Sequence, residues 1–216
     1  MSTHSPQKRL GLAREPGDAL FEVVASSGWQ PITLQVTAMR ATGLPVPLAL
    51  PDAVILLSPA GAQQATLPEG VPVLVTGEGT ARALPGHSVW IPEQPSAEGL
   101  WALLQARFPG GGEFLLVRGE RSRGYLEAAA GGTAWHLHPW ITHAERPLEP
   151  LPRLPDLEAV LALSPQQAEV LGPLAANLLR FAWGERSAQA FAAVGHPAQA
   201  TCGPKSEALE RMLRAH

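Results

Sequence analysis

Two serines in this 216-residue chain each stand between an apolar run and a helical pattern. Ser58 follows the run 53–57, Ser164 follows the run 159–163, and a proline comes directly after each serine. All-apolar runs of this kind are typical of parallel strands covered on both faces, and proline suits the first position of a helix. Each serine is therefore expected where the carboxyl end of a strand meets a helix N-terminus. That edge of an α/β sheet binds ligands, and its unpaired helix N–H groups attract anions.

Two further hydroxyls are expected at equivalent places. Thr80 follows Gly79 and Ser187 follows Arg186, each in a turn after an apolar strand. For every one of these hydroxyls the plainer interpretation is a helix cap, which contributes about 1 kcal/mol to stability. Two such turns in each half of the chain, facing a common cleft, favour ligand binding.

Arginines at strand ends are a second kind of anion-binding group. Arg14 and Arg118 each follow a predicted strand, and Arg121 and Arg123 lie just beyond Arg118. A guanidinium can bind a carboxylate through two parallel hydrogen bonds, so Arg14 and Arg118 are predicted to hold an acidic substrate. For Arg121 and Arg123 we favour a solvated surface position.

The elements that position these residues follow from apolar runs and turn residues. Strands are predicted at residues 10–13, 32–36, 53–57, 73–75, 88–91, 114–117, 133–141, 159–163 and 178–183. Helices are predicted at 19–26 after Asp18, from 59, at 81–84 after Thr80, after Ser96, around Tyr125, from 165 and at 206–215. The ring of Tyr125, the only tyrosine, is expected in the core. Strands that alternate with helices predict an α/β protein with parallel sheets.

The two halves of the chain also resemble each other. Three pairs of similar segments follow in the same order at nearly one offset: 106 residues for Ser58 and Ser164, 107 for Gly77 and Gly184, and 104 for Arg14 and Arg118. These matches predict a duplicated α/β unit.

Residues 73–105 contain two local motifs at a defined spacing. The strand and glycine turn VLVTGEGTARAL is followed, after a second short strand, by the Ser-capped segment SAEGL at residues 96–100. Together these motifs resemble uroporphyrinogen-III synthase, and the resemblance covers essentially the whole chain. It implies two similar parallel-sheet α/β domains joined by a two-stranded linker. Residues 1–38 plus 148–216 would form domain 1 and residues 39–147 domain 2, with crossings near 36–40 and 140–150.

The resemblance also implies an activity that uses no metal and no organic cofactor. Members of this family convert hydroxymethylbilane, a linear tetrapyrrole with many carboxylates, to uroporphyrinogen III by dehydration, ring D inversion and cyclisation. Substrate-binding residues are then expected at Arg14, Ser58, Thr80, Ser96, Arg118, Trp140, Ser164, Gly184 and Ser187. The implied partners are this substrate and, transiently, hydroxymethylbilane synthase, and the expected state is a monomer.

One position departs from the family's pattern. Trp140 stands where members of the family usually place a tyrosine, and indole cannot act as a general acid. His138 or His143 is therefore predicted to protonate the leaving hydroxyl. The alternative function is a HemD-like tetrapyrrole-binding protein with weakened catalysis.

The histidines allow a metal site as another alternative. Alternate residues of a strand share a face, so His136 and His138 could bind a metal together with His143 or Glu145. No second ligand cluster supports such a site, so we expect an exposed strand face and no metal.

Composition and charge exclude several classes of function. The formal net charge of −3 argues against nucleic acid or an anionic membrane as a partner. The single cysteine, Cys202, excludes an internal disulfide and is expected to be buried. No apolar run has the length of a membrane span, and residues 1–16 lack the core of a signal peptide. A cytoplasmic protein is therefore expected, and a secreted sensor of the periplasmic-binding-protein type is disfavoured.

Overall fold

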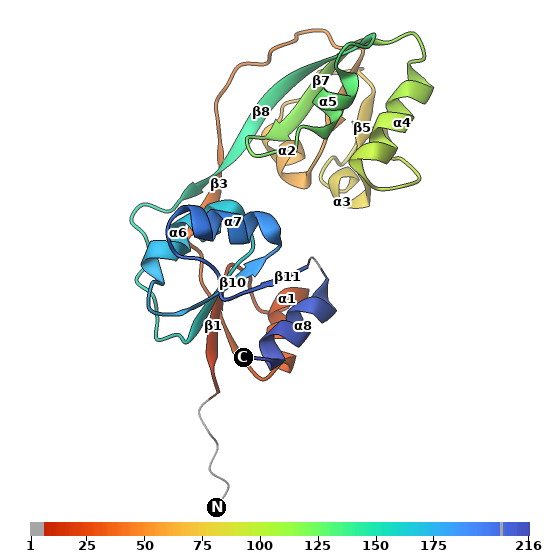
Figure 1. Ribbon diagram of the computed structural model, residues 1–216. Helices are drawn as coiled ribbons and strands as arrows, with labels where there is room; N and C mark the ends of the chain where they lie inside the picture. The colour runs from red at the N-terminus through yellow and green to blue at the C-terminus, as the bar shows by residue number, and fades with distance from the viewer. Residues whose placement is uncertain (1–6, 204) are drawn as a thin grey trace, which may run out of the picture. The chain divides into compact units, whose positions relative to one another are not determined.

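The computed structural model describes residues 7–203 and 205–216 (Figure 1). Contacts divide the chain into two compact units: unit 1 contains Met1–Ala38 and Glu145–His216, and unit 2 contains Met39–Ala144. Each unit has its own sheet, in which parallel strands alternate along the chain with helices. The predicted α/β class with parallel sheets is therefore confirmed.

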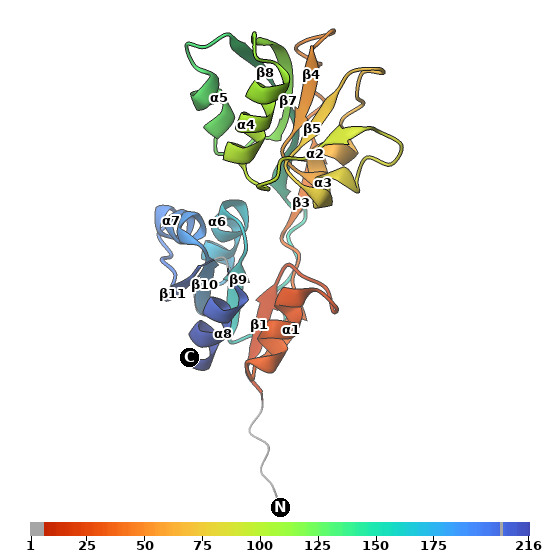
Figure 2. The same cartoon turned by 90° about the vertical axis from the view of Figure 1, so that its right-hand side faces the viewer.

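Unit 1 contains a five-stranded sheet of order β11-β10-β9-β1-β2, in which all neighbouring pairs are parallel. Its strands are β1 (Arg9–Leu12), β2 (Gln30–Thr33), β9 (Ala159–Ala162), β10 (Leu179–Trp183) and β11 (Ala200–Cys202). Four helices cover its two faces (Figure 2): α1 (Ala19–Ser26) and α8 (Ser206–Arg214) on one, α6 (Pro165–Leu174) and α7 (Glu185–Ala193) on the other.

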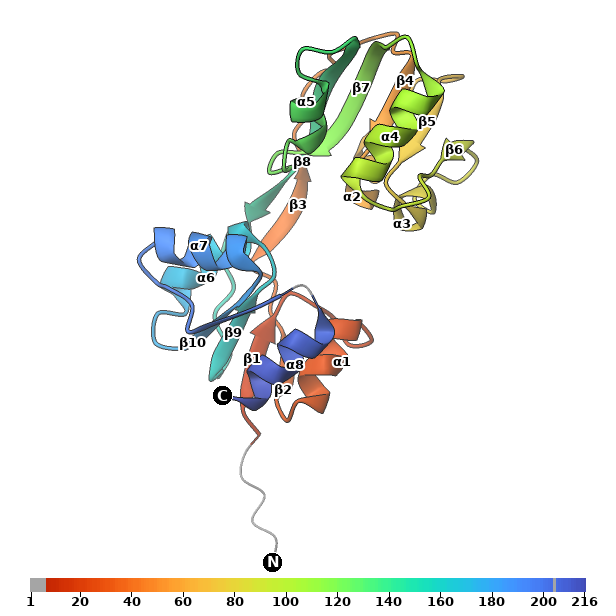
Figure 3. The same cartoon turned by 45° about the vertical axis from the view of Figure 1, so that its right-hand side comes forward.

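Unit 2 contains a six-stranded sheet of order β3-β8-β7-β4-β5-β6. Its strands are β3 (Thr37–Ala41), β4 (Ala53–Leu56), β5 (Val73–Val75), β6 (Val89–Trp90), β7 (Gly112–Gly119) and β8 (Trp135–Pro147). One face is covered by α4 (Ala97–Arg107) and α5 (Tyr125–Ala130), which lie in front of the strands in Figure 3, and the other by α2 (Pro59–Gln64) and α3 (Glu78–Ala81).

The two sheets have the same strand arrangement once the similar segments are matched. Strands β9, β10 and β11 correspond to β4, β5 and β6, and strands β1 and β2 correspond to β7 and β8. The order β11-β10-β9-β1-β2 then equals β6-β5-β4-β7-β8. The chain enters the two arrangements at different strands, and for this reason all of unit 2 separates β2 from β9.

The central strands are buried on both faces because their side chains alternate between two apolar clusters. In β9, Val160 and Ala162 belong to the cluster formed with α6 and α7. Ala159 and Leu161 belong to the cluster formed with α1 and α8. Strand β4 alternates in the same way between the two clusters of unit 2. Both strands were predicted from all-apolar runs, and this double coverage is the reason that the prediction succeeded.

Strands β3 and β8 are neighbours in the sheet, and each crosses the division between the units. In unit 2 the N–H of Thr42 donates to the carbonyl of Thr142 (3.0 Å), and in unit 1 the N–H of Leu148 donates to the carbonyl of Val36 (2.9 Å). These bonds lie at the two ends of the paired segment.

Some predicted elements need correction. The strand expected at 32–36 overlaps only the end of β2, which finishes at Thr33, and the next strand, β3, begins after it at Thr37. The strand expected at 133–141 continues to Pro147 because its second half pairs with β3. Strand β11 was not predicted, since its sequence Ala-Thr-Cys lacks the all-apolar run that indicated the equally short β5.

The prediction that Tyr125 packs in the core was wrong. Its side chain is 39% exposed at the first position of α5, whereas the next residue, Leu126, is 1% exposed and faces the core. No helix in the described part of the chain has both the length and the apolar character needed to cross a membrane.

Candidate functional site

Each sheet has a switch point, where the connections leave two neighbouring strands in opposite directions. In unit 1 it lies between β1 and β9, and in unit 2 between β4 and β7. Ligands of open α/β sheets bind outside the carboxyl ends of the strands at such points. The carboxyl edge of each sheet is therefore the candidate site.

The three predicted serine caps are present. In each case the serine Oγ accepts a hydrogen bond from the backbone N–H three residues later: Gly61 for Ser58 (3.2 Å), Gly99 for Ser96 (3.1 Å) and Gln167 for Ser164 (3.1 Å). Ser58 and Ser164 lie at the two switch points. Because each hydroxyl already caps its own helix, a contact of these serines with a substrate stays a prediction.

Thr80 does not cap α3, and this prediction was wrong. The helix begins at Glu78, three residues before the predicted start at residue 81, with Gly77 as its N-cap. Thr80 is buried within the helix, and its Oγ1 lies 3.4 Å from the Oγ1 of Thr76. The glycine turn allows the helix to begin before Thr80, although the position of the hydroxyl had predicted a start after it.

Ser187 fails as a cap for the same reason. Helix α7 begins at Glu185 after Gly184, whose φ of 88° lies in the left-handed region that favours glycine. Ser187 is buried in the first turn, and its Oγ donates to the carbonyl of Trp183 (3.3 Å). Since α7 has no side-chain cap, its N-terminus is a position on the edge of unit 1 that suits an anionic group.

His143, on β8, is a titratable residue beside the switch point of unit 2. Its ring fills the space that two glycines leave: a Cβ on Gly119 would lie 2.8 Å from the imidazole Nε2, and a Cβ on Gly61 would lie 3.7 Å from Cε1. The Nδ1 atom lies 3.0 Å from the Oγ1 of Thr142. Burial lowers the pKa of His143 below its ordinary value of 6.5, because the imidazolium would lose its hydration. The ring is therefore mostly neutral at neutral pH.

His138 lies elsewhere on the same strand. Its Nε2 is 2.5 Å from the Oε2 of Glu113, near the start of β7, and both side chains are partly exposed. His143 lies five positions after His138, which corresponds to roughly 16 Å of extended strand. The structure does not bring the two predicted proton donors together, and of the two it is His143 that lies at the carboxyl edge.

Trp140 is buried in unit 2, with 8% of its surface exposed. Its indole N–H donates to the backbone carbonyl of Leu44 (2.9 Å), which fixes the segment between β3 and β4 onto the sheet. The indole donor thus already has an acceptor within unit 2, and contact of Trp140 with a substrate stays a prediction.

Arg118 is held by its own unit. Its Nε lies 2.7 Å from the Oε1 of Glu127 on α5, and its Nη1 donates to the carbonyl of Gly119 (3.1 Å). The N–H of Nε is not aimed at the carboxylate, since both Arg118 Nε and Glu127 Oε2 are buried without a hydrogen-bond partner. A substrate carboxylate at Arg118 would have to displace Glu127 from this ion pair.

Arg14 follows β1 at the switch point of unit 1. Its Nε lies 3.4 Å from the Oδ2 of Asp18, and its Nη1 donates to the carbonyl of Ala13 (2.9 Å). The side chain is 40% exposed, and an ion pair in contact with solvent contributes little. Of the two predicted arginine clamps, Arg14 can therefore reorient towards a ligand at the lower cost.

The switch point of unit 1 contains a hydrogen-bonded network that sequence reasoning missed. Thr37 Oγ1 donates to Glu145 Oε1 (2.6 Å), and Gln167 Nε2 donates to the same oxygen (3.3 Å). Gln167 Oε1 in turn accepts the N–H of Leu163 (3.0 Å). A carboxylate thus lies at the first turn of α6, where the helix dipole favours negative charge. The internal repeat contained one indication of this network. Gln167 aligns with Gly61 of unit 2, so the two units differ in side chain at this position of the first helical turn.

The described residues contain no group of three or more His, Cys, Asp or Glu side chains that could hold a metal ion. Glu145, a ligand in the metal alternative, is bonded to Thr37 and Gln167. Cys202 is buried, as expected, and its burial raises the pKa of the thiol to about 11. The thiol therefore stays protonated near neutral pH and is a poor nucleophile.

Comparison with solved structures finds the same fold in uroporphyrinogen-III synthetase from Helicobacter pylori, with a TM-score of 0.63, 14% identity and coverage of 97% of this chain and 100% of that one. A mutant and the wild type of uroporphyrinogen III synthase from the thermophilic bacterium Thermus thermophilus have TM-scores of 0.49 and 0.45. The mutant is 20% identical with 96% of both chains covered, and the wild type 19% identical with 96% and 97% covered. Comparison with curated proteins gives no match.

The family model of uroporphyrinogen-III synthase HemD matches residues 19–209, which include all of unit 2, most of unit 1 and both switch-point serines. Most of the chain lies within this match. The chain therefore belongs to the uroporphyrinogen-III synthase family.

Proposed function

We propose that the protein converts hydroxymethylbilane to uroporphyrinogen III. The family implies a cyclising lyase, and the match of the family model to residues 19–209 is the observation that carries the proposal. The reaction would remove water from the linear tetrapyrrole, invert ring D and close the macrocycle, without a metal or organic cofactor.

The chemistry begins with protonation of the hydroxymethyl oxygen, so that water leaves and a reactive azafulvene forms. Ring D attacks this carbon through its own substituted carbon and gives a spiro intermediate. Rearrangement and ring closure, with loss of a proton, give uroporphyrinogen III. The competing spontaneous closure gives isomer I, so the main task of the protein is to hold the chain curled.

The substrate carboxylates would be held at the carboxyl edges of the sheets. In unit 1 the uncapped N-terminus of α7 after Gly184 and the exposed guanidinium of Arg14 support this role. Both favour negative charge, and a guanidinium adds two directed hydrogen bonds. In the α6 turn Glu145 already supplies a carboxylate, so substrate contacts there would be to neutral groups.

His143 is the proposed proton donor. It lies at the carboxyl edge of unit 2 beside Gly61 and Gly119, and its pKa is lowered by burial. Only a minor fraction of the ring is protonated at neutral pH. General-acid catalysis by His143 would therefore accelerate as the pH falls towards that lowered pKa.

We further propose that residues 1–38 with 148–216 and residues 39–147 are the two domains of a cytoplasmic monomer. Hydroxymethylbilane synthase would be a transient partner that delivers the substrate. Size-exclusion chromatography with light scattering tests the oligomeric state, and a dimer would overturn that part of the proposal.

A coupled assay tests the activity. Hydroxymethylbilane would be generated in place by its synthase, the protein added in catalytic amount, and the oxidised uroporphyrin isomers separated by chromatography. Predominant isomer III is expected. An isomer I fraction unchanged from the control without the protein would exclude the proposed activity and leave the fold assignment intact.

A further inference from the structure

Strand β8 has an irregularity in its pairing with β7, and it lies next to the imidazole of His143. Ile141 pairs with Arg118 of β7, and the next pair joins His143 to Gly119. Thr142 lies between these pairs without a partner residue on β7. An extra residue of this kind forms a β-bulge, which bends the strand and re-aims the side chains beside it.

The bulge places the hydroxyl of Thr142 beside the ring of the next residue. Neighbouring side chains of a regular strand point to opposite faces of the sheet. Here the Oγ1 of Thr142 lies 3.0 Å from the Nδ1 of His143, and both side chains are buried. Neither side chain makes another hydrogen bond or an ion pair with a described residue. Thr142 is therefore the polar group that orients the imidazole.

Backbone hydrogen bonds hold the bulge from both sides. The N–H of Thr42 donates to the carbonyl of Thr142 (3.0 Å), and the N–H of Glu120 donates to the carbonyl of His143 (3.0 Å). The hydroxyl of Thr42 also donates to the carbonyl of Ile141. The contact between hydroxyl and imidazole is therefore fixed before any ligand binds.

The other nitrogen of the ring is open. The Nε2 of His143 lies beside Gly119 and makes no hydrogen bond to a described residue. In the described part of the chain, the buried side-chain nitrogens and oxygens without a partner are Arg118 Nε and Glu127 Oε2. Because the unpaired Nε2 is not one of these buried atoms, it is in contact with solvent. It is the ring nitrogen that a ligand can reach.

The position of the ring hydrogen decides what the imidazole can do. A neutral ring has one N–H, and the hydrogen bond of one nitrogen sets the state of the other. In the protonated ring both nitrogens are donors, so the Thr142 hydroxyl has to accept. A contact that persists while the ring gains and loses a proton therefore requires that Nδ1 keeps its hydrogen. The proton is then exchanged at Nε2.

We propose that Thr142 is the positioning residue of His143: its Oγ1 accepts the Nδ1–H, so that the accessible Nε2 is the nitrogen that exchanges the proton. The catalytic part of this inference rests on the proposed function, whereas the tautomer is a property of unit 2 by itself. In the reaction the proton would move from Nε2 to the hydroxymethyl oxygen of the substrate. The ring is left neutral in the Nδ1–H form, which the hydroxyl stabilises.

The ¹⁵N resonances of the imidazole test the tautomer, because a nitrogen with a hydrogen and a nitrogen with a lone pair differ widely in chemical shift. Full-length protein labelled with ¹⁵N-histidine would be measured above pH 6.5, with His143→Gln to assign the signals. We expect the hydrogen on Nδ1. Thr142→Val removes the acceptor and should mix in the Nε2–H form, and Thr142→Ser should keep the original form. An Nε2–H ring in the unaltered protein, or no change in Thr142→Val, would overturn the proposal.

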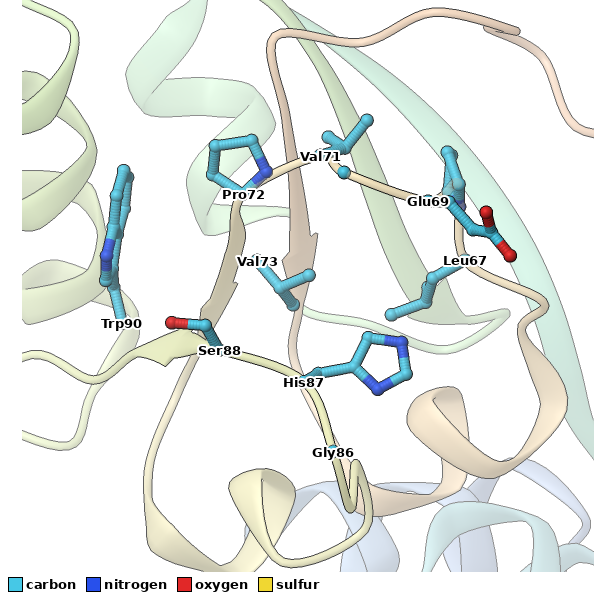
Figure 4. Close-up of a pocket in the computed structure, with 11 residues that line it drawn as sticks. Leu67, Glu69, Val71, Pro72, Val73, Gly86, His87, Ser88 and Trp90 are labelled. Carbon is cyan, nitrogen blue, oxygen red and sulfur yellow. The ribbon is translucent and has the colours of Figure 1, made fainter.

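His87 supplies an internal reference for these spectra. Its ring lies at a cavity of about 430 Å³ beside the amino ends of β5 and β6, the edge of the sheet opposite to His143 (Figure 4). The side chain is exposed and makes no hydrogen bond to a described residue, so its shifts should be the same in every variant. Thr201→Val, at an exposed position of β11, is the matched control and should leave the His143 shifts unchanged.

The assay for isomer III measures the catalytic part. In Thr142→Val, kcat should fall by about tenfold with KM unchanged, and Thr142→Ser should regain most of this loss. Full activity in a Thr142→Val protein that has lost the pure Nδ1–H form would refute the positioning role. If the unaltered protein makes no isomer III, the proposed function and the catalytic role of Thr142 fail together. The tautomer then still decides whether Thr142 fixes the ring.

Discussion

The two switch points share a backbone plan but hold different side chains. In each, a serine caps the helix that follows the strand, and the third residue of that helix faces the edge of the sheet. In unit 2 this residue is Gly61, and the imidazole of His143 occupies the adjacent space. In unit 1 it is Gln167, which binds the carboxylate of Glu145.

This difference shows what the duplication has kept and what it has changed. The strand, serine and helix that build each edge are retained, because they depend only on local backbone bonds. The group beside them has become a buried, mostly neutral imidazole in one unit and a hydrogen-bonded carboxylate in the other. The edge of unit 2 therefore offers an imidazole that can exchange a proton near neutral pH.

The largest expected effect is on catalysis. His143→Gln removes the proposed proton donor but keeps a polar side chain of similar size, and kcat for isomer III should fall by about a hundredfold. The exposed His136→Gln on the same strand is the control and should leave kcat unchanged. If His143→Gln keeps the rate within threefold of the control, the difference between the two edges has no catalytic meaning.

The next effect concerns how tightly the imidazole is packed. Gly119→Ala places a Cβ within 2.8 Å of the His143 Nε2, so we expect a loss of about 1–3 kcal/mol in the free energy of unfolding, measured with urea. Gly79→Ala in α3 is the control, since no atom lies within 4 Å of its added Cβ. A double-mutant cycle with His143→Ala should recover most of the loss, and additive effects would contradict this contact.

The corresponding change in unit 1 should have a smaller effect. Gln167→Ala leaves the carboxylate of Glu145 with Thr37 alone and should lower the free energy of unfolding by about 1–2 kcal/mol. Gln189→Ala, at an exposed position of α7, is the matched control and should change stability by less than about 0.5 kcal/mol. Equal effects at the two glutamines would show that the network adds nothing.

The smallest effect is the pH dependence of stability that His143 should contribute. Its pKa in the folded protein lies below the unfolded value of 6.5, so the unfolded chain binds the proton more tightly. The contribution is fully present above pH 6.5 and is lost as the pH falls towards the lowered pKa, with a slope no steeper than about 1.4 kcal/mol per pH unit. Urea unfolding would be measured between about pH 5 and 8 for the unaltered protein and for His143→Gln. The pH dependence of the free energy of unfolding should differ between the two proteins in this window alone.

Local patterns predicted the backbone of the site well. The caps at Ser58, Ser96 and Ser164 follow from a hydroxyl before a helical pattern, and all three are confirmed. Thr80 and Ser187 failed because a glycine N-cap can start the helix before the hydroxyl, and hydroxyl patterns do not distinguish the two cases.

The side-chain contacts of the site were harder to predict because they join residues that are far apart in sequence. Thr37 and Glu145 are 108 residues apart, and Gln167 lies a further 22 residues along the chain. Which residues of β7 lie beside His138 and His143 depends on the register between β7 and β8, which no local pattern contains.

The two sheets share one strand order, but the chain enters that order at a different strand in each unit. This difference has a consequence for folding while the chain is being synthesised. Unit 2 is continuous in sequence, and its sheet can be completed as soon as Pro147, the last residue of β8, has left the ribosome. Strand β1, in contrast, needs β9 as its second neighbour, and β9 begins at Ala159. From the end of β2 at Thr33, about 126 residues must be added, which takes roughly 6–25 s at typical rates of synthesis. During that interval the first strands of unit 1 stay unpaired on one side, and the inserted unit folds before the unit that encloses it in sequence.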